Sequence, residues 1–226
     1  MTLPSKPTEN TLLEPAALAH QLLTPITATG NYAAALLASQ QTGTLSPEKL
    51  QEGLHRLLNE TARARDTARA LKRLFRADHP TFAAIEAETL LNRAVARVSP
   101  ARIVLRIPTT APSLVCDAGL IEEALVNLLC NAVASAAPHP VCAGFALQEG
   151  ALNFFVTNPV PDAQQALKTM QTPGKSTTPG GTGLGLLLVR RILAAHRSTL
   201  RLQAENHTLT VSFTLRNVST PKTLTR

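Results

Sequence analysis

The sequence contains no tryptophan, and aromatic residues make up only 3% of its 226 residues. Proteins that bind single-stranded nucleic acid stack the bases on aromatic side chains, so this composition argues against that class. The formal net charge is +7, but the lysines and arginines are scattered along the chain and do not cluster with aromatics. We therefore expect no nucleic-acid partner, and an acidic protein partner fits the charge equally well.

Cysteines are few and long apolar runs are missing. The three cysteines, Cys116, Cys130 and Cys142, are odd in number, lack the spacing of metal ligands and have apolar neighbours. These features predict reduced, buried thiols and a cytoplasmic protein. No apolar run approaches the roughly 20 residues that cross a bilayer, and residues 1–7 lack the apolar core of a signal peptide. We expect no membrane span in this chain.

Apolar residues make up 44% of the sequence, enough for a substantial core. The Pro/Thr/Ser-rich residues 1–13 and the tail 217–226 are predicted to be disordered. Between them, helical periodicity stops at residues 77–80, where a proline prevents a helix from continuing. We therefore predict two domains, 14–78 and 79–216, in an α+β fold.

The first domain is predicted to be an antiparallel helical hairpin, with Ser46 as the N-cap of its second helix. Apolar and small residues recur at alternating steps of four and three along both helices, which is typical of helices packed nearly parallel. A lone hairpin would leave this seam of apolar and small residues exposed to water. We therefore predict a homodimer in which two hairpins form a four-helix bundle. The seam residues are Ala19, Leu23, Ile26, Gly30, Ala33 and Leu37 in the first helix, and Leu50, Leu54, Leu57, Thr61, Ala64, Ala68, Leu71 and Phe75 in the second.

The second domain mixes helical and strand patterns, which predicts an α/β sandwich with helices on one face of a sheet. Helices are expected over residues 87–97, 118–136 and 184–196. The Pro/Gly-rich residues 158–180 are predicted to form a loop. Strands are expected at residues 102–106, 141–147, 152–156, 199–204 and 208–215.

His20 is a candidate phosphoacceptor. It lies beside the seam residue Ala19, so we expect it on the flank of the bundle, accessible to solvent and to another protein. A neutral imidazole is a competent nucleophile near neutral pH. Thr24 lies one helical turn further on and could orient a water molecule, while Pro25 would interrupt the helix. The alternative is a surface histidine next to an incidental proline kink.

Asn127 and Asn131 lie four residues apart, on one face of an otherwise apolar helix. Buried amides need partners, and a nucleotide with Mg²⁺ would supply them. The amide oxygen is a suitable ligand for the metal, and the NH₂ group can donate to a phosphate oxygen. The alternative is a pair of structural amides that cap loops.

Residues 180–186 place glycines at alternating positions ahead of an apolar helix. Their N–H groups and the helix N-terminus would favour phosphate oxygens. The spacing does not fit a dinucleotide-binding fingerprint. The nearby residues 174–176 are not a P-loop either, because Thr169 stands where its first glycine would be. The alternative is a flexible turn.

In this order and spacing, the three blocks resemble the transmitter core of sensor histidine kinases, whose nucleotide domain is of the Bergerat ATP-binding type. The resemblance spans residues 14–216, and its second glycine box is the most specific of the three motifs. The matching residues are His20–Pro25 for the phosphoacceptor box, Asp117, Glu123, Asn127 and Asn131 for the asparagine box, and Gly181–Leu186, Val189–Ile192 and Ala195–His196 for the second glycine box.

The resemblance implies an ATP-dependent protein histidine kinase. It would transfer the γ-phosphoryl group of ATP to His20 and then to an aspartate of a response regulator, mainly through positioning and charge neutralisation. Asn131 would hold Mg²⁺, and Asn127 would assist at the phosphates. Gly181, Gly183 and Gly185 would form the lid hinge over the triphosphate, and Leu184 would also contact the nucleotide.

Two positions differ from the family pattern. Gln21 follows the histidine where the family usually has an acidic residue, and it cannot accept a proton. Residues 156–161 replace the first glycine box and bring prolines in place of glycines, although Asn158 can still offer a carbonyl oxygen to the adenine amino group. The alternative function is therefore a dimeric phosphotransfer or phosphatase module with a degenerate nucleotide domain, acting through His20 and Thr24. A protein-binding scaffold is a third possibility.

Overall fold

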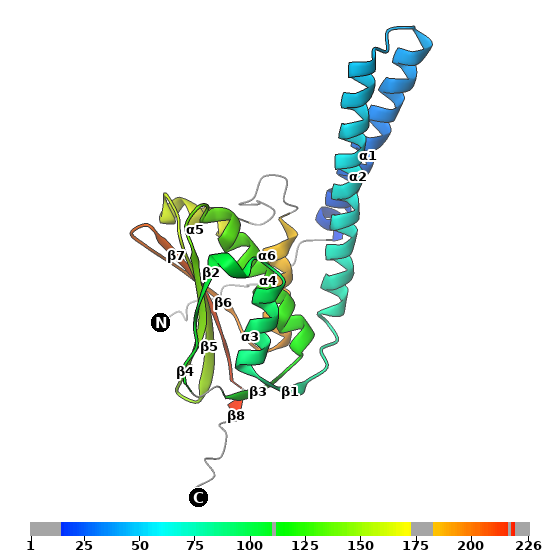
Figure 1. Cartoon of the computed structure of the whole chain (residues 1–226). Helices are drawn as coiled ribbons and strands as arrows, with labels where there is room; N and C mark the ends of the chain where they lie inside the picture. The colour runs from blue at the N-terminus through cyan, green and yellow to red at the C-terminus, as the bar shows by residue number, and fades with distance from the viewer. Residues whose placement is uncertain (1–14, 110–111, 173–182, 217, 220–226) are drawn as a thin grey trace, which may run out of the picture. The chain divides into compact units, whose positions relative to one another are not determined.

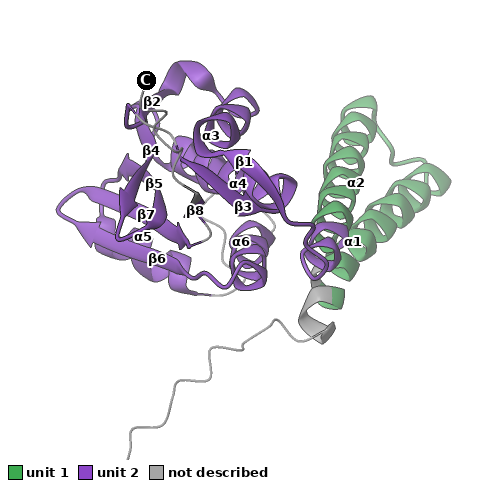
Figure 2. Cartoon of the chain, turned by 90° about the horizontal axis from the view of Figure 1, so that it is seen from below, with its two compact units in different colours: residues 1–71 green, residues 72–226 purple. Residues whose placement is uncertain are grey.

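The structure, a computed structural model, divides the chain into two compact units, residues 1–71 and residues 72–226 (Figure 2). The first unit is helical and the second combines helices with a mixed sheet (Figure 1), so the predicted α+β class is confirmed. The structure describes residues 15–109, 112–172, 183–216 and 218–219.

The first unit is a hairpin of α1 (Pro15–Gln41) and most of α2 (Pro47–Arg76). The backbone turns after α1 at Gly43, whose φ of 68° is one that glycine adopts without strain. Ser46 caps α2 as predicted, since its Oγ accepts a hydrogen bond from the N–H of Lys49 at 3.3 Å.

The two helices of the hairpin approach closely at Gly53. A Cβ atom there would lie 2.6 Å from Cδ2 of Leu36, so the missing side chain lets Leu36 pack against α2. Nearby, the guanidinium of Arg56 lies 5.4 Å from the centre of the Tyr32 ring and adds a cation–π contact between the helices.

Much of the predicted seam is open to solvent in the single chain. Leu23, Ile26 and Leu37 of α1 are 56%, 48% and 59% exposed, and Leu54 of α2 is 49% exposed. Contacts within one hairpin therefore leave these apolar side chains uncovered.

The second unit is built on a five-stranded sheet with the order β2-β4-β5-β7-β6. The β2–β4 pair is parallel and the other neighbours are antiparallel. A smaller antiparallel sheet has the order β1-β3-β8. The strands of the large sheet are β2 (Ile103–Arg106), β4 (Val141–Gln148), β5 (Ala151–Pro159), β6 (Leu200–Glu205) and β7 (Thr208–Leu215), and those of the small sheet are β1 (Ala83–Glu86), β3 (Ser113–Cys116) and β8 (Val218–Ser219).

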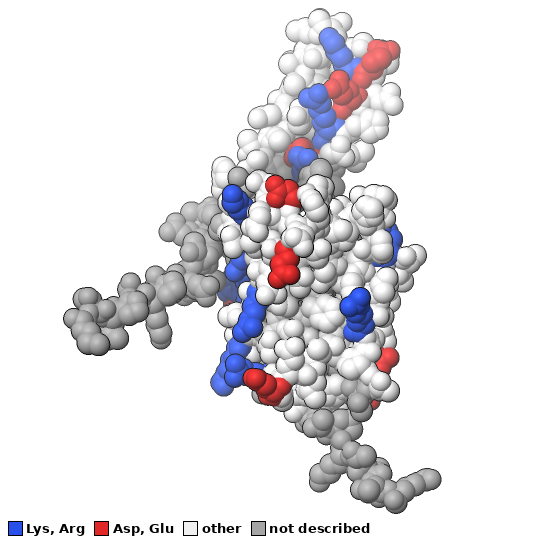
Figure 3. Space-filling model, turned by 90° about the vertical axis from the view of Figure 1, so that its left-hand side faces the viewer, with Lys and Arg blue, Asp and Glu red and all other residues white. Residues whose placement is uncertain are grey.

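One face of the large sheet is covered by α3 (Ala87–Ala96), α4 (Ala118–Ser135) and α6 (Leu184–Ala195), as Figure 1 shows. Fully buried aromatic side chains from neighbouring strands, Phe154 and Phe213, stack there with ring centres 5.3 Å apart. The opposite face carries threonine, asparagine and glutamine from β5, β6 and β7, and it is largely uncharged in Figure 3.

The Pro/Gly-rich segment predicted as one loop over residues 158–180 is partly regular, so that prediction is wrong. β5 continues to Pro159, and α5 (Ala163–Gln171) follows with Asp162 as its N-cap. The Asp162 carboxylate accepts a hydrogen bond from the N–H of Gln165 at 2.8 Å, which stabilises the start of this helix. The short strands β1 and β3 were not predicted, and β8 lies within the tail that was expected to be disordered.

Among the described residues, α4 alone is long and apolar enough to cross a membrane, with 18 residues of mean hydropathy 1.3. In this fold it places Leu120, Ile121, Leu125 and Leu129 in the core, each at most 1% exposed. A core helix has the same composition as a membrane span, so the expected absence of a span stays a prediction.

Candidate functional site

His20 lies in the second turn of α1 with its imidazole exposed, as its place beside the seam predicts. Thr24 is also exposed, and its hydroxyl donates to the backbone carbonyl of His20 at 2.8 Å. This bond uses the hydroxyl proton of Thr24 and leaves its oxygen able to accept a hydrogen bond. Gln21 lies in the same turn of the α1 backbone. The exposed imidazole is therefore accessible to act as a nucleophile toward an incoming electrophile.

Asn127 and Asn131 lie on α4 and are both partly buried. The Nδ2 of Asn127 donates to the carbonyl of Glu123 at 2.8 Å, which fixes the plane of the amide. The backbone carbonyl of Asn131 accepts a hydrogen bond from the hydroxyl of Ser135 at 2.8 Å. The two amides are therefore one helical turn apart at the edge of the core.

The start of α6 brings two predicted glycines next to α4. Gly183 is the N-cap residue, with φ 68° and ψ 0°, a left-handed conformation that favours glycine. Gly185 already lies in the first turn of the helix, and a Cβ atom there would come within 2.8 Å of Oδ1 of Asn127. The hinge role that the resemblance implies for Gly185 stays a prediction. Leu184 is fully buried, and Gly181 lies outside the described residues.

Asn158 lies near the end of β5 and is only 2% exposed. Its strand neighbours Phe154 and Val156 are buried on the same, helix-covered face of the sheet, because alternate residues of a strand point to one side. The Nδ2 of Asn158 makes a long bond of 3.4 Å to the carbonyl of Pro159. A buried amide on this face is placed to recognise a polar group that enters beneath the helices.

His196 joins the end of α6 to the start of α4. Its Nε2 accepts a hydrogen bond from the backbone N–H of Asp117 at 3.0 Å, and its Nδ1 lies 2.7 Å from the carbonyl of Ile192. Since Nε2 accepts, the ring carries its proton on Nδ1 and donates it to Ile192. The ring of Phe82 packs against the imidazole at a tilt, with the two ring centres 5.1 Å apart. The motif included His196, but the sequence did not indicate this structural role.

The last turn of α2 and the segment after it are held by paired charges within the second unit. Arg73 lies 2.9 Å from the carboxylate of Glu123, and Arg76 lies 3.5 Å from that of Asp117. Asp78 forms a two-point ion pair with Arg191 of α6. Reciprocal hydrogen bonds lower the pKa of Asp78 and raise that of Arg191. No sequence pattern predicts these ion pairs, because the two residues of each pair are far apart in the chain.

Curated relatives of this chain are sensor histidine kinases, although no protein-family model matches it. It is 29% identical over 208 residues to the sensor-like histidine kinase SenX3 of Mycolicibacterium smegmatis, covering 84% of this chain and 53% of the relative. It is 29% identical over 153 residues to the sensor histidine kinase ZraS of Escherichia coli, covering 64% of this chain and 33% of the relative. The resemblance to a histidine kinase transmitter core is confirmed. The chain spans about half of SenX3, and less of ZraS.

Solved structures of histidine kinases share the fold of this chain. The histidine kinase AdeS of Acinetobacter baumannii matches 88% of this chain and 98% of its own, with a TM-score of 0.63 at 17% identity. ThkA in complex with the response regulator protein TrrA matches 89% of this chain and 60% of its own, with a TM-score of 0.65 at 17% identity. Full-length ShkA in complex with AMPPNP matches 92% of this chain and 46% of its own, with a TM-score of 0.62 at 20% identity.

The described residues fit a nucleotide with Mg²⁺ better than a metal held by protein alone. The described residues contain no group of three His, Cys, Asp or Glu side chains that could hold a metal ion. Mg²⁺ usually takes one or two protein ligands and completes its shell with phosphate oxygens and water. The partly buried amide of Asn131 can supply such a ligand. The donor set therefore suits a metal that arrives with a triphosphate.

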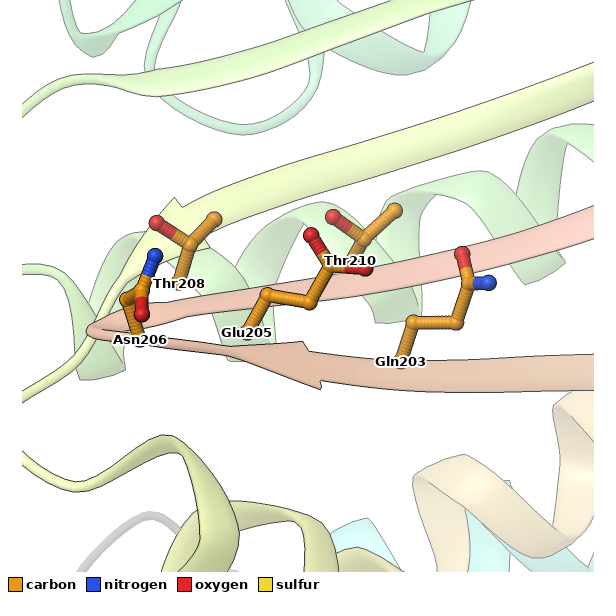
Figure 4. Close-up of a pocket in the computed structure, with 5 residues that line it drawn as sticks. All are labelled: Gln203, Glu205, Asn206, Thr208 and Thr210. Atoms are coloured by element: carbon orange, nitrogen blue, oxygen red, sulfur yellow. The ribbon is translucent and has the colours of Figure 1, made fainter.

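A polar pocket of about 230 Å³ lies elsewhere, at the β6–β7 hairpin (Figure 4). It lies on the open face of the sheet, because alternate residues of β6 and β7 point away from the helices. The asparagine and glycine motifs lie on the helix side, so this pocket is separate from the candidate site. Its lining residues are Gln203, Glu205, Asn206, Thr208 and Thr210.

Proposed function

We propose that this chain is the catalytic core of a two-component sensor kinase, which phosphorylates His20 from ATP and passes the phosphoryl group to an aspartate of a response regulator. One observation carries the proposal. The second unit brings the Asn127 amide against Gly185 at the start of α6, while the first unit exposes the imidazole of His20. The nucleotide-bound neighbour ShkA and the regulator-bound neighbour ThkA support it by fold alone.

The chemistry follows from the exposed imidazole. The unprotonated ring nitrogen of His20 attacks the γ-phosphorus, the bond between phosphorus and the bridging oxygen breaks, and ADP leaves. The proton on the other ring nitrogen goes to water, because the amide of Gln21 cannot accept it. In the second step an aspartate carboxylate of the regulator attacks the phosphorus, and the bond to the His20 nitrogen breaks.

The second unit would bind the nucleotide and neutralise its charge. Asn131 would hold Mg²⁺, which neutralises charge that develops on the phosphate oxygens. Asn127 would donate to a phosphate, the backbone at Gly181 and Gly183 would surround the phosphates, and Asn158 would accept a bond from the adenine amino group.

We also propose that two copies form a four-helix bundle through α1 and α2. The apolar side chains of Leu23, Ile26, Leu37 and Leu54 are about half exposed in the single chain, and a second hairpin would cover them. The exposed Thr24 could then orient water for removing the phosphoryl group from a regulator. A cytoplasmic setting suits the three free cysteines.

Labelling with γ-labelled ATP and Mg²⁺ tests the kinase proposal. The chain should acquire acid-labile label, and His20→Ala should abolish it. His55→Ala is the matched control, because His55 is an exposed histidine of α2 and should keep full labelling. Label that persists in His20→Ala would refute the assignment.

A second function is favoured by one observation. β5 ends in Asn158 and Pro159, and Pro161 follows, so prolines stand where the family pattern has glycines. A stiff segment here suits a phosphotransfer or phosphatase module that has lost nucleotide binding. That module would show no heat of ATP binding in calorimetry, yet it would exchange phosphate with a phosphorylated regulator through His20 and Thr24.

A further inference from the structure

Helices α4 and α6 are joined near both ends of α6. At its start, Gly185 faces Asn127 of α4, and at its end, His196 accepts a hydrogen bond from the N–H of Asp117 at 3.0 Å. Asp117 is the N-cap of α4, whereas Asn127 lies in its middle. The two helices therefore run antiparallel and are held in a fixed register.

The contact at Gly185 depends on its missing side chain. A Cβ atom at this position would lie 2.8 Å from Oδ1 of Asn127, closer than a real Cβ atom approaches a neighbour, and at an ordinary contact distance of 3.8 Å from its Cγ. Apart from the backbone of α6 and adjacent residues, no other described atom lies within 4 Å of that position. A side chain here would therefore have to displace one neighbour, the amide of Asn127.

The Asn127 amide has little freedom to move away. Its Nδ2 donates to the carbonyl of Glu123 at 2.8 Å, so a rotation that relieved a clash at Oδ1 would break this bond. The backbone of Gly185 is helical, so the residue is not needed for a left-handed conformation. In a helix, glycine is less favourable than alanine unless space is limiting.

We propose that Gly185 is a positioning residue whose missing side chain seats the Asn127 amide against the first turn of α6. The seat holds the amide in the orientation from which Asn127 meets a nucleotide phosphate. This inference rests on the proposed function, which assigns the phosphate contact to Asn127. It gives this glycine a close-contact role in addition to the hinge role that the resemblance implies.

Thermal unfolding of the full chain tests the seat without any ligand. Gly185→Ala should lower the melting temperature of the second unit by about 2–4 °C, because the new methyl group displaces the amide. In an Asn127→Ala background the obstruction is gone. The same change should then raise the melting temperature by about 2 °C through helix propensity.

Asn131→Ala is the matched control background. Asn131 is an amide on the same helix, but it does not approach Gly185, so Gly185→Ala should still destabilise that variant. A loss of stability that is equal in the Asn127→Ala and Asn131→Ala backgrounds would overturn the seat.

Calorimetry with a non-hydrolysable ATP analogue and Mg²⁺ tests the positioning role. Asn127→Ala should weaken binding by about tenfold or more, the loss expected for one hydrogen bond to a charged group. Gly185→Ala should weaken it similarly, and the double variant should bind no worse than Asn127→Ala alone. A purely structural glycine would change the melting temperature and leave affinity unchanged.

The melting and calorimetry experiments distinguish a failure of the proposed phosphate contact from a failure of the inference about Gly185. If Asn127→Ala binds the analogue as tightly as the unchanged chain, the proposed phosphate contact fails, and the melting experiment still decides whether the seat exists. If both single variants lose affinity and their losses multiply in the double variant, Gly185 acts independently of Asn127 and the inference is wrong.

Discussion

Asp78 and Arg191 are 113 residues apart in the chain and form a two-point ion pair, with Nε of Arg191 2.7 Å from Oδ1 of Asp78. The pair fastens the segment after α2 to α6. Arg73 with Glu123 and Arg76 with Asp117 fasten the last turn of α2 to α4. The residues at which helical periodicity stops in the sequence are therefore firmly attached within the second unit.

The Asp78 pair predicts a pH effect. The hydrogen bonds from Arg191 hold the pKa of Asp78 below its usual value. A carboxyl group with a lowered pKa in the folded state stabilises the fold above its unfolded pKa of about 4, and the stabilisation disappears as the pH falls through the folded-state value. Asp78→Asn should therefore melt below the unchanged chain near neutral pH, and the difference should vanish in acid.

The control for that experiment removes the partner. In an Arg191→Gln background, Asp78→Asn should have little effect at any pH, because the carboxylate has lost its ion pair. Both side chains are partly exposed, so the expected stabilisation is small, about 0.5–1 kcal/mol. A pH-independent effect of Asp78→Asn would contradict the role given to Arg191.

Asp117 should be among the most sensitive residues of the second unit. Its carboxylate, whose side chain is 5% exposed, accepts bonds from the N–H groups of Leu120 and Thr81 at 2.9 and 2.8 Å and pairs with Arg76. Asp117→Ala leaves these donors unmatched and should lower the free energy of unfolding by about 2–4 kcal/mol. Urea titration followed by circular dichroism measures this loss. Asp117→Asn keeps one acceptor oxygen and should lose less.

The bundle predicts a change of oligomeric state. Leu54→Asp should dissociate the dimer and leave the hairpin helical, because this side chain is 49% exposed in the single chain. Sedimentation velocity at micromolar concentration measures the state. The exposed polar neighbour Asn59 provides the matched control, and Asn59→Asp should stay dimeric. An unchanged chain that sediments as a monomer would refute the bundle.

The cysteines should differ in reactivity. Burial raises the pKa of the Cys116 thiol to about 12, helped by the neighbouring charge of Asp117. Cys130 is exposed, so the burial predicted for it is wrong, and desolvation raises the pKa of its thiol. At mildly alkaline pH, iodoacetamide should modify Cys130 while Cys116 remains protected until urea unfolds the chain. Mass spectrometry of the peptides distinguishes the two, and early labelling of Cys116 would show that its strand opens in the native state.

The long helices could be predicted because their signals are local. Ser46 marks the start of α2, and Gly183 precedes α6. Helix α5 was missed because the prolines and glycines of residues 158–180 dominated the pattern, although Asp162 supplied an N-cap signal. Strands β1 and β3 have four residues each, too few to show a clear alternation.

The candidate site was predicted as separate motifs and not as a set of contacts. Spacing placed Asn127 and Asn131 on one helix face, but nothing in the chain linked Asn127 to Gly185 or Asp117 to His196. Such contacts depend on how α6 lies against α4, which is decided by packing across the whole core. The lid hinge expected at Gly185 stays a prediction, since its position in the first turn of α6 does not test it.

The two contacts of α6 with α4 fix the number of residues that can lie between them. Gly185 and His196 are 11 residues apart, which is close to three turns at about 3.6 residues per turn, so both lie along one edge of the helix. Deleting even the exposed Arg190 would rotate one end relative to the other by about 100°. Evolution can therefore exchange side chains on the outer edge of this helix but cannot change the number of its residues without losing one of the two anchors.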